Sequence, residues 1–232
     1  MKTYSFISWR FHASLVVLVT FVAFATFAGP PLICHTFDIG SAKSLPWISH
    51  DWNLSGSETY DTSKLAADTT AILASNSTVL VHMETLRRAT LYARKDPAAA
   101  KALFATLTGA TKSAQSSAPP TLSYFDIGYL AEAYKQWLGK DSQNPAAGID
   151  GYALVKQALQ LRGSDPQMEF AAAFITLGGP AVEHQQHVQK ALAGASADPL
   201  LARNLSSHFI GDQGQTIAQM LSNPAVAQER KP

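Results

Sequence analysis

The sequence predicts an all-α fold, built of antiparallel helical hairpins that stack behind an irregular N-terminal arm. Apolar residues recur three and four positions apart through residues 62–222, which is the period of a helix with one buried face. Glycine and proline residues divide this stretch into about nine segments of helical length. No run of alternating polar and apolar residues predicts a β-strand. We therefore expect a wholly helical body.

Residues 1–28 have the composition of a secretory signal peptide. Lys2 and Arg10 precede an apolar run that ends at Ala28. Cleavage near Ala25 or Ala28 would release an exported chain, either periplasmic or secreted. The run is shorter than the roughly 20 residues that a membrane-spanning helix needs. An uncleaved signal anchor is the alternative, and it would be the chain's one attachment to a membrane.

Residues 29–61 form the arm, in which glycine and proline residues leave no helical period. The arm carries several aromatic residues, including Trp47 and Trp52. We expect these two side chains to pin the arm onto the helical body rather than to contact a ligand, since buried aromatic rings commonly supply packing. Cys34 is the single cysteine, so an intrachain disulfide is excluded. We expect its thiol to be buried, to pair with another chain or to remain reactive.

The helical body begins after Asp61, which belongs to the residue types that cap helix N-termini. A first helix is followed by a second over residues 78–94. In this second helix, Glu84, Arg87 and Arg88 are spaced as i,i+3 and i,i+4 ion pairs, which favours a solvated helix face.

Asp96-Pro97 should end the second helix and begin a third, because aspartate caps a helix and proline suits its first turn. Residues 109–120 are rich in Ser, Thr, Ala and Pro, and they predict a linker before a fourth helix over residues 121–138. The tail, residues 223–232, is expected to fray. Apolar stripes predict the remaining helices around residues 154–159, 170–177, 188–192, 201–209 and 217–221.

Two units of the chain superpose at an offset of 33 residues. The first unit's Val155, Ala158, Leu159, Asp165, Pro166 and Gly178 recur as Val188, Ala191, Leu192, Asp198, Pro199 and Gly211. A period near 34 residues, with an Asp-Pro turn between helices, is the signature of a helical-hairpin repeat. The sequence therefore resembles a degenerate tetratricopeptide repeat array over about residues 84–211. In that comparison Gly128 stands where a small residue lets two helices approach.

The resemblance implies stacked hairpins with a continuous core and a concave face that binds a peptide or another protein domain. It implies no catalytic residue. Two polar loops, at residues 109–120 and 139–149, interrupt the array.

The charge excludes one large class of partner. The chain has 18 Lys and Arg residues against 17 Asp and Glu residues, a formal net charge of +1. Loss of residues 1–28 removes Lys2, Arg10 and no acidic residue, which changes this charge to −1. Such a chain lacks the basic field that holds a nucleic-acid backbone, so we expect no nucleic-acid partner.

Candidate catalytic and metal-binding motifs are incomplete. His184 and His187 lie three positions apart beside Glu183, whereas the zinc-protease pattern needs histidines four positions apart with a glutamate inside the pair. No serine-nucleophile or phosphate-binding motif is present in the sequence. We therefore predict no catalytic residue, no cofactor and no metal ligand.

The sequence thus favours an exported, non-catalytic helical repeat protein that binds another protein or a peptide in the cell envelope. One alternative is a small exported metal-binding protein or hydrolase that uses His184 and His187. Another is a structural envelope protein that docks onto a neighbour through its arm.

Overall fold

The computed structural model describes residues 30–34, 36–48, 54, 57–114, 121–139 and 143–210. Within these residues the chain forms eight α-helices and no strand, which confirms the all-α prediction. A short 3-10 helix, Thr62–Lys64, precedes the first of them, and a π-helix, Ser206–Ile210, follows the last. The α-helices are α1 Leu65–Ser75, α2 Val79–Ala93, α3 Pro97–Ala114, α4 Thr121–Trp137, α5 Gly151–Arg162, α6 Pro166–Ile175, α7 Ala181–Gly194 and α8 Pro199–Leu205.

Several helices begin and end close to their predicted bounds. The prediction of helices over residues 78–94 and 121–138 matches α2 and α4 within a residue at each end. The linker predicted over residues 109–120 is wrong in its first half, since α3 continues through Gly109 to Ala114. A lone glycine weakens a helix by only about 1 kcal/mol relative to alanine, so the surrounding helix can absorb it.

Residues 1–28, Trp52, the helix expected near residues 217–221 and the tail at residues 223–232 lie outside the described residues. The signal peptide therefore stays a prediction. No helix within the described ranges is both long enough and apolar enough to cross a membrane.

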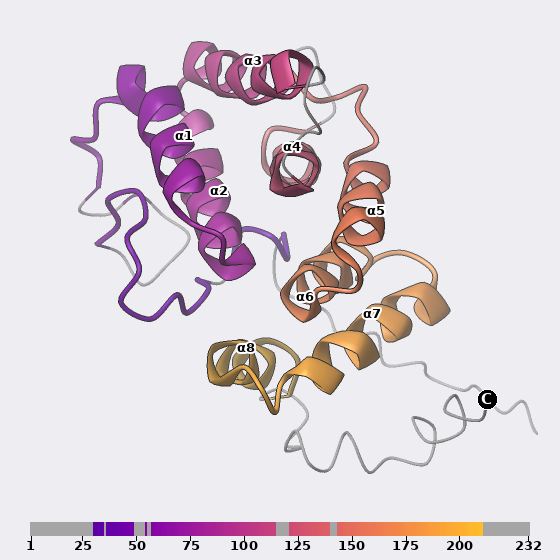
Figure 1. The fold of residues 1–232 in the computed structure, drawn as a ribbon. Coiled ribbons are helices and arrows are strands. Elements are labelled where there is room, and N and C mark those ends of the chain that lie inside the picture. The colour runs from indigo at the N-terminus through magenta and orange to yellow at the C-terminus, as the bar shows by residue number, and fades with distance from the viewer. Residues whose placement is uncertain are drawn as a thin grey trace, which may run out of the picture.

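Figure 1 shows α4 end-on, with α2, α3 and α5 around it and with α7 and α8 beyond α6. α4 packs against the two helices that precede it, α2 and α3, and against the two that follow it, α5 and α6. α2 also contacts α6, and α8 contacts both α6 and α7. One hydrophobic cluster extends from Leu65 in α1 to Leu205 in α8, and it includes Leu32 and Ile33 of the arm.

A pair of glycines lets α4 and α5 cross closely. A Cβ atom on Gly128 would lie 2.5 Å from the carbonyl oxygen of Gly151, and a Cβ atom on Gly151 would meet the carbonyl oxygen of Gly128 in return. Any larger residue at either position would force the two helices apart. The expectation that Gly128 lets two helices approach is confirmed.

The two Asp-Pro turns of the sequence repeat have the same local structure. The Asp165 carboxylate caps α6, and that of Asp198 caps α8, each by accepting hydrogen bonds from the backbone N–H groups of the helix's second and third residues. The side chain of Gln167 joins these caps to α2. Its amide nitrogen donates to Asp198 at 2.5 Å, and its amide oxygen accepts from the N–H of Leu80 at 3.1 Å. The N-terminal ends of α2, α6 and α8 therefore lie together.

Candidate functional site

The arm, residues 30–34 and 36–48, lies against the helical body and covers the polar side of α2. The side chains of Glu84 and Arg87 are 0% exposed, and that of Arg88 is 17% exposed. The prediction of a solvated face for these three residues is therefore wrong, because the arm takes the place of solvent. We call the side chains that hold the arm the arm-binding face: Glu84, Thr85, Arg87, Arg88 and Tyr92 of α2, Gln136 of α4, Phe170 and Phe174 of α6, Arg203 and Asn204 of α8, and His208.

Glu84 is the polar centre of this face. Its Oε1 accepts from Arg87 Nη2 at 3.0 Å and from Arg88 Nε at 2.7 Å. Its Oε2 accepts from Arg87 Nε at 2.8 Å and from the backbone N–H of Phe37 in the arm at 3.0 Å. One buried carboxylate thus faces two guanidinium groups, so the guanidinium N–H groups that it does not bond need other acceptors.

The arm supplies those acceptors from its main chain. Arg87 Nη1 donates to the carbonyl oxygen of Ile33 at 3.0 Å, and Arg88 Nη1 donates to that of Leu45 at 2.6 Å. Hydrogen bonds from charged donors are stronger than those between neutral groups. Because they end on main-chain atoms, they do not depend on which side chains the arm carries.

Trp47 pins the far end of the arm. Its ring lies edge-to-face with that of Tyr92, and the Arg87 guanidinium carbon lies 5.2 Å from its centroid. The Tyr92 hydroxyl donates to the carbonyl oxygen of Pro46 at 2.5 Å. The expectation that the arm's tryptophans dock it onto the body is confirmed for Trp47, whereas Trp52 lies outside the described residues.

α8 holds the middle of the arm through Asn204, which is 0% exposed. Its Oδ1 accepts from the N–H of Asp38 at 2.9 Å, and its Nδ2 donates to the carbonyl oxygen of Asp38 at 2.8 Å. Arg203 Nε donates to the Asp38 carboxylate at 2.7 Å, and this hydrogen bond lowers the pKa of Asp38. The neighbouring Phe37 ring enters the aromatic cluster of α6.

The body's side chains therefore bond seven main-chain groups of the arm: the N–H groups of Leu32, Phe37 and Asp38 and the carbonyl groups of Ile33, Asp38, Leu45 and Pro46. Peptide-binding proteins use such main-chain bonds for affinity and side-chain pockets for specificity. The arm is thus bound through its main chain, as a peptide ligand would be, and it also makes backbone turns of its own at residues 30–34 and 39–42.

The histidines singled out in the sequence lie on α7, away from these contacts. His184 Nδ1 lies 2.9 Å from the carbonyl oxygen of Ala173, so this nitrogen carries a proton and donates. Burial lowers the pKa of His184, which favours the neutral ring. His187 Nδ1 lies 2.5 Å from the carboxylate of Glu169, and its Nε2 lies 2.6 Å from the Tyr152 hydroxyl.

Both ring nitrogens of His187 are thus engaged. A metal ion would have to displace Glu169 or Tyr152 from it, and among the described residues no three His, Cys, Asp or Glu side chains gather in a way that could hold one. The Tyr152 hydroxyl also donates to Glu183 at 2.7 Å. Burial and that hydrogen bond raise the pKa of Tyr152, so its phenol stays protonated near neutral pH and is a poor nucleophile.

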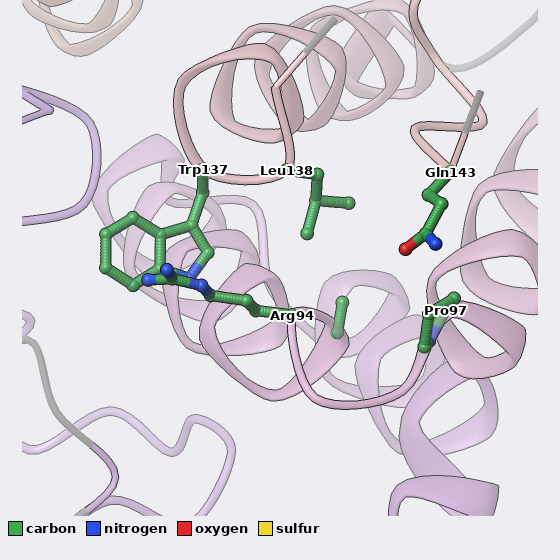
Figure 2. Close-up of a pocket in the computed structure, with 6 residues that line it drawn as sticks. Arg94, Pro97, Trp137, Leu138 and Gln143 are labelled. Atoms are coloured by element: carbon green, nitrogen blue, oxygen red, sulfur yellow. The ribbon is translucent and has the colours of Figure 1, made fainter. Parts of the chain in front are cut away.

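A pocket of about 260 Å³ opens where α2 and α4 end (Figure 2). The Arg94 guanidinium carbon stacks 4.2 Å from the centroid of the Trp137 ring, and Figure 2 shows Gln143 and Pro97 on the opposite side. The described residues that line it supply one cation, one side-chain amide and apolar surface, with no carboxylate, imidazole or thiol. This pocket therefore offers no acid–base or nucleophilic chemistry of its own.

Two residues, Asn204 of the arm-binding face and Cys34 of the arm, show what the sequence could and could not reveal. Asn204 lies three positions after Leu201 and one before Leu205, so a polar side chain on an apolar stripe was the available signal for it.

Cys34 is a half-buried free cysteine, and burial raises the pKa of its thiol although Arg87 opposes the shift. A thiol in this state is less reactive near neutral pH than an exposed one.

Comparison of the chain with protein-family models, with curated proteins and with solved structures found no match.

Proposed function

We propose that this chain is an exported, non-catalytic protein of stacked helical hairpins, and that it binds an extended segment of a partner protein on the arm-binding face. Export rests on the signal-like composition of residues 1–28. In this proposal the arm is an intramolecular ligand that occupies the face until a partner replaces it.

The order of helix contacts supports hairpin stacking. α4 contacts both members of the preceding pair, α2 and α3. α6 likewise contacts α4 and α5, and α8 contacts α6 and α7. α4, α6 and α8 therefore each pack on the pair of helices before them, as expected when one hairpin stacks on the next. Most side chains that hold the arm come from α2, α4, α6 and α8, so one row of helices supplies the face.

The observation that carries the proposal is the set of main-chain bonds between the body and the arm. A segment that served only as a hydrophobic cover would need apolar contacts alone. Here the buried side chains of Glu84, Arg87 and Asn204 are aimed at amide and carbonyl groups that every peptide has. Such donors and acceptors are suited to bind other extended segments as well.

A nicked protein tests the proposal without removing any part of the chain. A protease recognition sequence inserted after Ile48 allows the arm to be cut from the body while it stays bound. Labelled synthetic peptide of residues 30–48, with Cys34→Ser, is then added in excess, and its entry is followed by fluorescence anisotropy. We expect saturable exchange, while circular dichroism shows the body still folded.

The matched control is the same peptide with N-methyl groups on the amides of Phe37 and Asp38. It keeps every side chain but loses the donors that Glu84 and Asn204 accept, so it should bind at least about tenfold more weakly. Equal binding of both peptides would contradict main-chain recognition. A nicked arm that never exchanges until the body unfolds would show that it is a permanent part of the core, and the proposal would fail.

A further inference from the structure

At Phe37 and Asp38 the body contacts two adjacent side chains of the arm as well as its main chain. Their partners come from α2, α6, α8 and the π-helix, which lie far apart in the sequence. Thr36 and Asp38 are exposed, as is Gly40, whereas Leu32 and Leu45 on either side are 0% exposed. The middle of the arm is thus more exposed than its two apolar ends, although Phe37 itself is only 3% exposed.

An aromatic subsite receives Phe37. Its ring centroid lies 6.0 Å from that of Phe170 and 5.4 Å from that of Phe174, with interplanar angles of 83° and 82°. His208 closes a further side at 5.1 Å. Edge-to-face contacts of this kind favour a flat ring over an aliphatic side chain of similar volume. The subsite thus selects an aromatic residue.

A subsite for an acidic side chain, formed by Arg203, lies beside the aromatic subsite. Arg203 Nε donates to the Asp38 carboxylate at 2.7 Å, and the Arg203 side chain remains 56% exposed. Asn204 fixes the main chain of the same residue from both sides. Asn204 is itself oriented by donating to the carbonyl oxygen of Leu200 at 2.9 Å. In this arrangement the Arg203 guanidinium meets the side chain of the residue that directly follows the aromatic one.

We propose that these two subsites together dock a partner protein's extended segment in which an aromatic residue is followed directly by aspartate or glutamate. This inference rests on the proposed function, because Phe37 and Asp38 must leave before such a segment binds. The tethered arm competes at an effective concentration of about millimolar, so a partner has to bind tightly or through a second contact.

The test uses residues 29–232 of the chain with Phe37→Ala and Asp38→Ala, which empties both subsites and leaves the arm's ends in place. The probe is a labelled peptide of residues 34–42 with Cys34→Ser. We expect it to bind this opened chain at least about tenfold more tightly than the wild-type chain, where the arm competes. In the peptide, Phe37→Leu should weaken binding about tenfold, and Asp38→Asn severalfold.

Exchanging the charges of Arg203 and of the peptide's Asp38 tests whether these two side chains pair directly. Adding Arg203→Glu to the opened chain should weaken the unmodified peptide and should restore binding of a peptide with Asp38→Lys. Arg203 is exposed, so this substitution leaves the core untouched. A merely structural role for Arg203 would not produce the rescue.

The possible outcomes separate the two proposals. If peptides with different residues at positions 37 and 38 bind the opened chain equally well, the preference for an aromatic residue followed by an acidic one is wrong, but the proposed function of peptide binding stands. If no peptide binds the opened chain, and none exchanges into the nicked protein, both proposals fail. If the wild-type chain forms dimers that excess peptide converts to monomers, the occupant is another copy's arm and the partner assignment is overturned. Should the opened chain not fold, competition by the same peptides in the nicked protein gives the same ranking.

Discussion

Glu84→Gln is the substitution that most directly tests how the arm is held. The Glu84 carboxylate is 0% exposed and accepts four hydrogen bonds, three from guanidinium groups and one from the arm. Glutamine keeps the shape but removes the charge, and it turns one acceptor into an NH₂ group that faces a cation. Breaking a buried ion pair from one side costs roughly 3–5 kcal/mol, because the remaining charge is left uncompensated. For a chain of this size the melting temperature should fall by about 6–20 °C.

The free energy of unfolding would be measured by urea denaturation, followed by circular dichroism. Hydrogen exchange at the amide of Phe37 should accelerate more than exchange in α5, since Glu84 accepts that N–H. Glu58→Gln is the matched control, and as an exposed site it should change stability by less than about 0.5 kcal/mol. The reasoning is refuted if Glu84→Gln stays within about 1 kcal/mol of the wild type, with the Phe37 amide still protected.

Three further predictions concern the body. Gly128→Ala should destabilise the chain by several kcal/mol, because its Cβ has no room. Gly109→Ala, whose Cβ meets nothing within 4 Å, should stabilise α3 by about 0.5–1 kcal/mol. In thermal melts the melting temperature should therefore fall for the first variant and rise for the second. Asp198→Ala should cost about 1–2 kcal/mol in urea denaturation, since α8 loses its cap; no loss would contradict the capping role. Burial opposes protonation of His82, but the hydrogen bond and charge of Asp126 outweigh it and raise the pKa of His82 above 6.5. The stability that the raised pKa of His82 contributes is therefore fully present below pH 6.5 and is lost as the pH rises through the raised pKa. Burial also raises the pKa of Asp126, so the measurement stays above about pH 6. Melting temperatures between about pH 6 and about pH 9 should fall in the wild type, and Asp126→Asn should remove that fall.

The features that the sequence predicted well are those set by near neighbours along the chain. Asp165 and Asp198 cap helices by accepting from N–H groups only two and three positions further along the chain. The repeated Asp-Pro turn could therefore be recognised from the sequence before the structure was known. Gly128 was identified through a family resemblance, and the close crossing of α4 and α5 gives its physical reason. The stacking of the hairpins stays a proposal.

The arm-binding face could not be predicted because each of its contacts joins distant parts of the chain. Spacing alone shows that Glu84, Arg87 and Arg88 can pair with one another, but not whether solvent or protein lies over them. That depends on the arm, which meets α2 about 50 positions away. Buried charges look like surface charges in a sequence until their acceptors, here two main-chain carbonyl groups, are known.

The separation between the arm and α8 also fixes an order of events. Asp38 and Asn204 are 166 positions apart, and Leu32 and Gln136 are 104 apart. Contacts between such distant positions form late in folding, because chain closure must precede any gain from them. The arm is synthesised first, yet its full binding face exists only after the last helix has folded. The arm can therefore meet α2 as soon as that helix has formed, whereas its bonds to Arg203 and Asn204 must wait for α8.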